Sequence, residues 1–177
     1  MRAVVLAVLL AGALPSASLP ATGKTTRSLS SEVRAHPWTV VLFFSSECPV
    51  QRAHDPRLLE LVRDFAPRGV SFIAVDAQAD ASMEKAEQAL SKRGYPFPIV
   101  VDVDGTWADA LEVRFSTTLV VLDHQGHVRY RGGLDDERVK ISNEATPLAR
   151  RALEQLLAGH EPERVDTKAL GCVLRRR

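Results

Sequence analysis

The chain has 177 residues, of which 45% are hydrophobic and 25% are charged, and its formal net charge at pH 7 is +1. This length and composition predict one globular domain with a buried core. A chain so close to neutrality offers no broad basic surface, which argues against nucleic acid or an anionic membrane as a partner.

The first 21 residues have the pattern of a secretory signal peptide. A positive charge at Arg2 precedes an apolar run over Ala3–Leu14, and small residues follow, so that cleavage after Ala17 or Ala21 would fit. The apolar run is too short to span a bilayer, which needs about 20 residues. We therefore expect residues 1–21 to be removed and the product to be exported, periplasmic or secreted, without stable membrane insertion. An uncleaved membrane anchor is the alternative.

A polar linker is expected over residues 22–34, and apolar runs then alternate with helical patterns. Such alternation is typical of a sheet built through crossover helices. Strands are expected over residues 39–44, 69–76, 97–102, 118–123 and 127–132, and helices over residues 49–65, 82–93, 107–113 and 147–159.

Cys48 is the first candidate for chemistry, and an exported chain meets an oxidising compartment. The run "TVVLFF" is typical of a strand buried on both faces, and it leads directly to Cys48. Pro49 suits the first position of a helix, so Cys48 would lie at a helix N-terminus, where free amides and the helix dipole favour a thiolate. Glu47 opposes this effect. A Cys-x-x-Cys pair is absent, because Gln51 occupies the fourth position.

These motifs resemble the thioredoxin-like superfamily. "FFSSECPVQ" is similar to its strand and active-site loop, and Pro56 follows Cys48 by eight residues, where helices of this fold commonly carry a proline. The exported redoxin branch, which comprises AhpC/TSA and thiol-disulfide oxidoreductase-like proteins, is more similar still. Its hairpin resembles "LVVLDHQGHVRYRGGLDD", and its C-terminal Gly-Cys motif resembles "TKALGCVL".

The resemblance implies a thioredoxin-like α/β fold, with a mixed, mainly parallel central sheet and helices on both faces. The redoxin domain would occupy residues 35–159, and a C-terminal tail over residues 160–177 would carry Cys172, the second of the two cysteines.

Two departures from the family pattern concern the substrate-facing loops. Thioredoxin-like proteins usually carry a cis-proline before the strand that faces the cysteine, and Thr117 occupies the matching position here, so this peptide bond is expected to be trans. In the peroxiredoxin Pro-x-x-x-Thr-x-x-Cys motif, Ser45 can stand for the threonine, but Val41 replaces the proline. Arg114 lies about three residues from the expected arginine.

Three hypotheses follow for the two cysteines. In the first, Cys48 attacks a protein or small-molecule disulfide, or an oxidised thiol, and Cys172 resolves the mixed species. In the second, a hydroperoxide oxidises Cys48 and Cys172 condenses with the sulfenic acid. In the third, a permanent Cys48–Cys172 bond stabilises a binding module that has no enzymatic activity. The sequence does not identify the reductant.

The substrate site is expected to comprise Ser45, Pro49 and Thr117, with Trp38 at its rim. His54 could approach the thiol, although the commoner role of such a residue is packing. No histidine or cysteine spacing matches a metal site, and we expect neither a metal nor another cofactor.

Asp76 and Asp102 end two of the expected strands. They could shuttle protons, but carboxylates at strand ends more often form turns.

Overall fold

The computed structural model describes residues 13–140 and 142–175. The strands are β1 (Leu19–Ala21), β2 (Thr25–Arg27), β3 (Trp38–Phe44), β4 (Val70–Asp76), β5 (Ile99–Val101), β6 (Thr118–Asp123) and β7 (Val128–Gly132). The helices are α1 (Leu29–Ala35), α2 (Pro49–Phe65), the 3-10 helix η1 (Ala66–Arg68), α3 (Met83–Arg93), α4 (Thr106–Ala110) and α5 (Leu148–Leu157). The strands and helices expected after residue 38 are all present, with bounds shifted by a few residues.

The strands form one sheet in the order β2-β1-β5-β4-β3-β6-β7. β3 lies between β4, which is parallel to it, and β6, which is antiparallel. The sheet is mixed, as expected, but the prediction that it is mainly parallel is wrong. Among the described residues only the β3–β4 and β4–β5 pairs are parallel, since β1 and β2 add antiparallel pairs at one edge and the β6–β7 hairpin adds them at the other.

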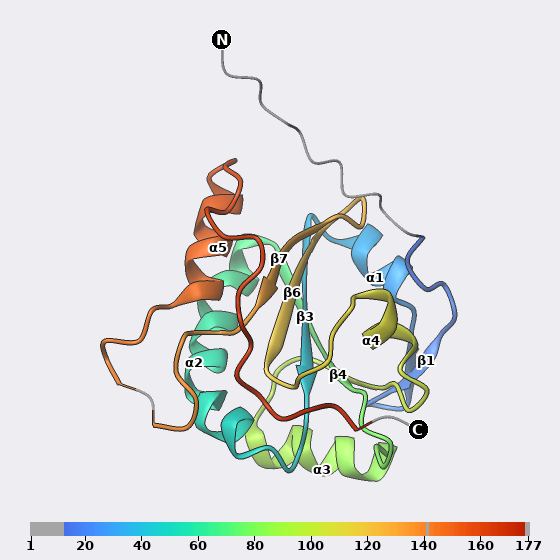
Figure 1. Ribbon diagram of the computed structural model, residues 1–177. Helices are drawn as coiled ribbons and strands as arrows, with labels where there is room; N and C mark the ends of the chain where they lie inside the picture. Colours follow the sequence, from blue (N-terminus) through green and yellow to red (C-terminus); the bar gives the residue numbers. More distant parts are fainter. Residues whose placement is uncertain (1–12, 141, 176–177) are drawn as a thin grey trace.

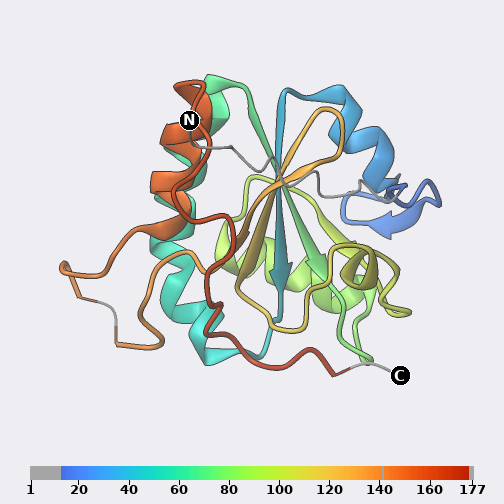
Figure 2. The same ribbon diagram turned by 45° about the horizontal axis from the view of Figure 1, so that its top comes forward.

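Helices cover both faces of the sheet (Figures 1 and 2). One face packs against α2, α3 and α5, and the other packs against α1 and α4. Consecutive residues of β3 alternate between the two cores, because side chains along a strand point to opposite faces. Val40 and Phe44 lie in the first core and Val41 and Phe43 in the second, all fully buried. This explains the continuous apolar run in the sequence.

The segment over residues 22–34 is not a linker, and this prediction is wrong. It contains β2 and most of α1, where Leu29 and Val33 are buried in the second core one helical turn apart. Ser28 caps α1, since its hydroxyl oxygen accepts a hydrogen bond from the amide of Ser31 at 3.2 Å. The polar residues around these two apolar positions conceal a short amphipathic helix.

The proposed signal segment lies partly outside the described residues, which begin at residue 13. Residues 19–21 form β1, and Ala21 pairs with Val100 of β5. Cleavage after Ala21 would therefore remove a strand from the sheet, whereas cleavage after Ala17 would keep it. Within the described part of the chain, no helix is both long enough and apolar enough to cross a membrane.

The C-terminal tail follows the sheet edge instead of leaving the domain (Figure 1). Beside β7, the amide of Arg131 donates to the carbonyl of Val165 at 2.7 Å, and the amide of Thr167 donates back to Arg131 at 2.9 Å. Further on, Phe115 and Val173 form an antiparallel bridge. These bonds carry residues 165–173 across the end of the sheet from which Cys48 emerges.

Candidate functional site

Cys48 lies where β3 passes into α2, at the N-cap of the helix. Its amide donates to the carbonyl of Ser45 at 3.3 Å, which closes the connecting loop. Pro49 follows as the first helical residue and is exposed, and so is Glu47 on the other side. Cys48 itself is only 2% exposed. The nucleophile expected from the sequence is thus in its expected place, but largely covered.

Cys172 forms a disulfide with Cys48, across 124 residues of sequence and a Cα–Cα distance of 6.0 Å. This separation lies within the range that a disulfide requires. The tail is held beside Cys48 by two further bonds at Ser116. The hydroxyl of Ser116 accepts from the amide of Cys172 at 3.0 Å, and the amide of Ser116 donates to the carbonyl of Cys172 at 2.8 Å. Cys172 is partly exposed, in contrast to Cys48.

Gly171 allows the tail to approach this closely. A Cβ atom at this position would overlap the carbonyl oxygen of Ser116 and crowd Oγ1 of Thr117. Since both atoms belong to the loop before β6, only a glycine fits between that loop and the disulfide.

Thr117 occupies the position at which the family usually carries a cis-proline. The described chain contains no cis peptide bond, which confirms the expected trans geometry. Thr117 has a φ of 62°, an uncommon value for a β-branched residue, and its amide donates to the carbonyl of Phe43 at 2.7 Å. The Ser116–Thr117 loop is therefore fixed to the end of β3 on one side and to the tail on the other.

Gln51 takes the place of the second cysteine of a Cys-x-x-Cys pair and belongs to a buried polar cluster that no pattern in the sequence predicted. Its Nε2 donates to Oδ1 of Asp55 and to the hydroxyl of Tyr95, both at 3.2 Å. Tyr95 donates to the same Asp55 oxygen at 2.5 Å, and burial, followed by this contact with Asp55, raises the pKa of Tyr95. Gln51 therefore serves the packing of α2.

Arg93 connects this cluster to the Cys48 loop. Its guanidinium donates to Oδ2 of Asp55 at 2.7 Å and to the carbonyl oxygen of Ser46 at 2.6 Å, and it lies over the ring of Phe44. An arginine at the end of a predicted helix gave no signal of this role, because its partners are 38 and 47 residues away in the sequence.

His54 is buried within α2 and makes an ion pair with Asp135, a contact that reaches the loop after β7. Its burial lowers the pKa, but the hydrogen bonds to Asp135 and to the Val50 carbonyl outweigh this effect, so the pKa of His54 is raised. The hydrogen-bond partners of its two ring nitrogens are thus Val50 and Asp135, not Cys48. This placement supports a structural role for His54. The sequence pattern did not indicate its ion pair with Asp135.

Asp76 and Asp102 both form turns, as the commoner interpretation predicted. Oδ1 of Asp76 accepts from the amide of Gln78 at 3.2 Å, and Oδ2 of Asp102 accepts from the amides of Trp107 and Ala108 at the start of α4. Burial raises the pKa of Asp76 to about 6. Asp76 pairs with Phe44 in the sheet register, so this carboxyl lies at the edge of the sheet where the Cys48 loop begins.

Trp38 does not lie near the disulfide, and its predicted place at the rim of the substrate site is wrong. It is the first residue of β3, whereas the Cys48 loop follows the last residue, Phe44. Six residue steps along a strand span about 20 Å, so the length of β3 separates them. Trp38 packs instead against the first core. Of the other residues expected in the substrate site, Ser45 and Thr117 are buried and Pro49 is exposed. Ser45 and Pro49 lie within three residues of Cys48 in the sequence, and Thr117 follows Ser116, which is hydrogen-bonded to Cys172.

No group of three or more histidine, cysteine, aspartate or glutamate side chains in residues 13–140 and 142–175 could hold a metal ion.

The sheet with its flanking helices, and a cysteine at the strand-to-helix junction, define a thioredoxin-like protein. The model of the AhpC/TSA family matches residues 11–131, more than half of the sequence. The chain therefore belongs to the AhpC/TSA family and is a thiol-based redox enzyme of the oxidoreductase or peroxidase type. Comparison with curated proteins found no match.

Solved structures agree with this fold. The chain is similar to a hypothetical protein from Sinorhizobium meliloti 1021, with 22% identity, a TM-score of 0.81 and coverage of 93% of this chain and 95% of the other. It is similar to an uncharacterized conserved protein from Geobacillus kaustophilus, with 26% identity, a TM-score of 0.79 and 93% coverage of both chains. A peroxiredoxin Q from Xanthomonas campestris matches with 19% identity, a TM-score of 0.61 and coverage of 84% and 96%.

Proposed function

We propose that this protein is an exported thiol-disulfide oxidoreductase in which Cys48 is the nucleophile and Cys172 is the resolving cysteine. The observation that carries the proposal is the bond between these cysteines, which joins a helix N-terminus to a tail held in place by its own hydrogen bonds. The substrate would be a protein or small-molecule disulfide, or an oxidised thiol. Export rests on the signal-like segment at the N-terminus.

The reaction begins with both cysteines reduced. The thiolate of Cys48 attacks one sulfur of the substrate disulfide, which forms a mixed disulfide and releases the other substrate sulfur as a thiolate. The thiolate of Cys172 then attacks the Cys48 sulfur and releases the second substrate thiolate. The substrate gains two electrons, and the protein is left with the Cys48–Cys172 bond seen in the structure.

The helix N-terminus stabilises the charge on Cys48 when it leaves or attacks. Unpaired amides and the helix dipole favour an anion there, and no acidic side chain lies in the first turn of α2. Ser45 and Thr117 line the two loops that meet at the cysteines and would contact the substrate, while Pro49 presents an exposed surface beside them.

The test is a measurement of the reduction potential of the Cys48–Cys172 bond in the purified protein. One equivalent of oxidant added to the reduced protein should produce this bond within one chain, as read by thiol counting and peptide mapping. Equilibration with dithiothreitol buffers should then give a potential above about −300 mV, the region of catalytic bonds. Two free thiols after oxidation would contradict the proposal. A potential well below about −300 mV would indicate the non-enzymatic module with a structural disulfide.

A peroxiredoxin-like peroxidase is the second candidate, and membership of the AhpC/TSA family favours it. A hydroperoxide would convert the Cys48 thiolate to a sulfenic acid and leave as an alcohol or water, and Cys172 would then condense with the sulfenic acid and release water. Val41, at the position of the family proline, lies in mid-strand, and Arg114 is an exposed residue beside the tail. Stopped-flow mixing with hydrogen peroxide separates the candidates, because a rate no faster than that of a free thiol excludes the peroxidase.

A further inference from the structure

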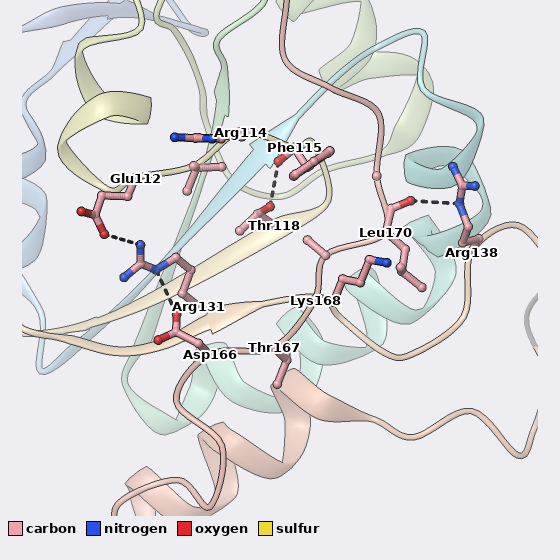
Figure 3. A pocket seen from close by; sticks show the side chains of 13 residues that line it. Glu112, Arg114, Phe115, Thr118, Arg131, Arg138, Asp166, Thr167, Lys168 and Leu170 are labelled. Atoms are coloured by element: carbon pink, nitrogen blue, oxygen red, sulfur yellow. Dashed lines mark hydrogen bonds and ion pairs between the residues drawn. The ribbon is translucent and has the colours of Figure 1, made fainter.

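A pocket of about 450 Å³ opens between the C-terminal tail and the β6–β7 hairpin (Figure 3). Its wall includes Gly171, the residue directly before Cys172, and its apolar surface includes Phe115 and Leu170. Phe115 is 41% exposed, which is unusual here for a large apolar side chain. This volume lies within the range of small-molecule binding sites.

The charge in this pocket is positive. Two carboxylates line the pocket, those of Glu112 and Asp166, and both pair with Arg131 at 2.6 and 3.2 Å (Figure 3). Three further cations line it, and in the described part of the chain none of them forms an ion pair: Arg114, Arg138 and Lys168. Arg138 donates a hydrogen bond to the carbonyl oxygen of Leu170 at 3.2 Å. The pocket therefore favours an anionic ligand with some apolar surface.

The two cysteines of the disulfide differ in how exposed the residue is. Cys48 is 2% exposed, whereas Cys172 is partly exposed and adjoins the pocket through Gly171. Thiol-disulfide exchange depends on which sulfur the incoming thiolate can reach and on how readily the other sulfur leaves. Attack at Cys172 would release Cys48 at the helix N-terminus, where a thiolate is favoured. The exposure of Cys172 and the stability of the Cys48 thiolate therefore both favour attack at Cys172.

We propose that this pocket binds a low-molecular-weight thiol that carries a carboxylate, and that this thiol reduces the protein by attacking Cys172. The proposal rests on the proposed oxidoreductase function. The thiolate forms a bond with the Cys172 sulfur, and the Cys48–Cys172 bond breaks to release the Cys48 thiolate. A second molecule of the same thiol then attacks the mixed disulfide, leaves as a symmetrical disulfide, and releases the Cys172 thiolate. Two thiols lose two electrons in total, and the protein gains them.

The test compares three small thiols as reductants of the oxidised protein: 3-mercaptopropionate, 2-mercaptoethanol and cysteamine. They carry a negative, a neutral and a positive group beside the sulfur, and rates are expressed per thiolate at low ionic strength. We expect 3-mercaptopropionate to react at least about 10-fold faster than 2-mercaptoethanol, and cysteamine to react more slowly than both. The rate with 3-mercaptopropionate should saturate with concentration, because a pocket can be filled.

Substitutions of the cations that line the pocket test whether the preference for the anionic thiol arises there. Lys168→Gln should reduce the preference for the anionic thiol several-fold, and the combination with Arg138→Gln should nearly abolish it. The rate with 2-mercaptoethanol, whose thiolate carries one negative charge fewer, should fall by a much smaller factor than the rate with 3-mercaptopropionate. The matched control is Lys92→Gln with Arg151→Gln, which removes two exposed cations outside this pocket and should preserve the preference.

The possible results distinguish a failure of the pocket proposal from a failure of the proposed oxidoreductase function. Equal rates for the anionic and neutral thiols, or a preference without saturation, would overturn the pocket and leave the oxidoreductase intact. A preference that survives Lys168→Gln with Arg138→Gln would also overturn it. A disulfide that no small thiol reduces would overturn the proposed function itself.

Discussion

His54 and Asp135 form a buried ion pair in which Nε2 of the imidazole lies 2.9 Å from Oδ1 of the carboxylate. The other ring nitrogen, Nδ1, lies 2.7 Å from the carbonyl oxygen of Val50. Both neighbours accept hydrogen bonds, so these contacts favour the imidazolium form of the ring, in which both nitrogens carry a proton. The second oxygen of Asp135 pairs with Arg57 at 2.8 Å. These contacts fasten the middle of α2 to the loop after β7.

The charge on His54 makes the stability of the fold depend on pH. The pKa of His54 is raised above 6.5, so its contribution is fully present below about pH 6.5 and is lost as the pH rises through the folded-state pKa. Urea unfolding from pH 6 to pH 9 should show this decline, and His54→Gln should remove it. The contribution of Asp135, whose pKa is lowered, is lost only in acid, below its usual value of 3.8.

The matched control is His124→Gln, which changes an exposed histidine at the turn between β6 and β7. It should leave the decline above pH 6.5 in place. A decline that persists in His54→Gln would show that another group titrates.

Asp76 should act in the opposite direction, because burial raises its pKa to about 6. The folded state keeps this proton longer than the unfolded state, so stability falls as the pH rises from about 3.8 to about 6. At pH 7.5 the ionised carboxylate costs stability, and Asp76→Asn should raise the free energy of unfolding by about 2 kcal/mol. At pH 4 the same variant should be nearly neutral.

Chemical unfolding of Asp76→Asn at both pH values checks this. Asp80→Asn is the control, since Asp80 is exposed and pairs with Lys85 on the surface. It should change stability by less than about 1 kcal/mol at either pH. A destabilised Asp76→Asn variant at pH 7.5 would show that the hydrogen bond to Gln78 outweighs the cost of burial.

Asp55 holds the cluster beneath the Cys48 loop together, since Gln51, Arg93 and Tyr95 all donate to it. Asp55→Ala leaves the Arg93 guanidinium without its carboxylate and should destabilise the fold by about 3–5 kcal/mol. Since Arg93 also holds the Ser46 carbonyl, the variant should loosen the loop, and reduced Cys48 should react faster with iodoacetamide.

Asp64→Ala removes a carboxylate that pairs with Arg63 and Arg150 at the surface, and it is the matched control. Ion pairs at the surface contribute little to stability, so Asp64→Ala should melt close to the parent. If Asp55→Ala melts at the same temperature as Asp64→Ala, the cluster around Asp55 does not stabilise the Cys48 loop.

Local patterns in the sequence were sufficient to predict most elements. The helix from Pro49 to Phe65 and the strand ending in Asp76 follow from apolar spacing and caps, which act over a few residues. The predicted position of Trp38 at the rim of the substrate site was wrong for a different reason. A sequence shows that a residue precedes a strand, but the seven-residue length of β3 carries it to the far end of the sheet from Cys48.

The candidate site was only partly predictable because its contacts are long-range. Cys48 could be selected from its strand-to-helix context, and the tail cysteine from a family resemblance. The pairing itself depends on the bonds between Ser116 and Cys172, which are 56 residues apart, and no spacing rule encodes them. The buried contact between Gln51 and Tyr95 spans 44 residues and has the same cause.

Gly171 should be the residue on which the pairing of the cysteines most depends. In Gly171→Ala, the new methyl group would overlap the Ser116 carbonyl oxygen, so either the tail or the Ser116–Thr117 loop must move. The loop is anchored to β3 through the Phe43 carbonyl, and the tail is therefore expected to give way. The Cys48–Cys172 bond should then be easier to reduce, and Cys172 should react faster with iodoacetamide after partial reduction.

The shift in the equilibrium with dithiothreitol should be at least about 10-fold, equivalent to about 1.4 kcal/mol or 30 mV for this two-electron couple. Val173→Ala is the control, since this neighbouring side chain is 61% exposed and its loss leaves the backbone bridge to Phe115 intact. It should keep the parental potential. If Gly171→Ala keeps it as well, the disulfide does not depend on close contact between the tail and the Ser116–Thr117 loop, because the tail can then pair with Cys48 without that contact.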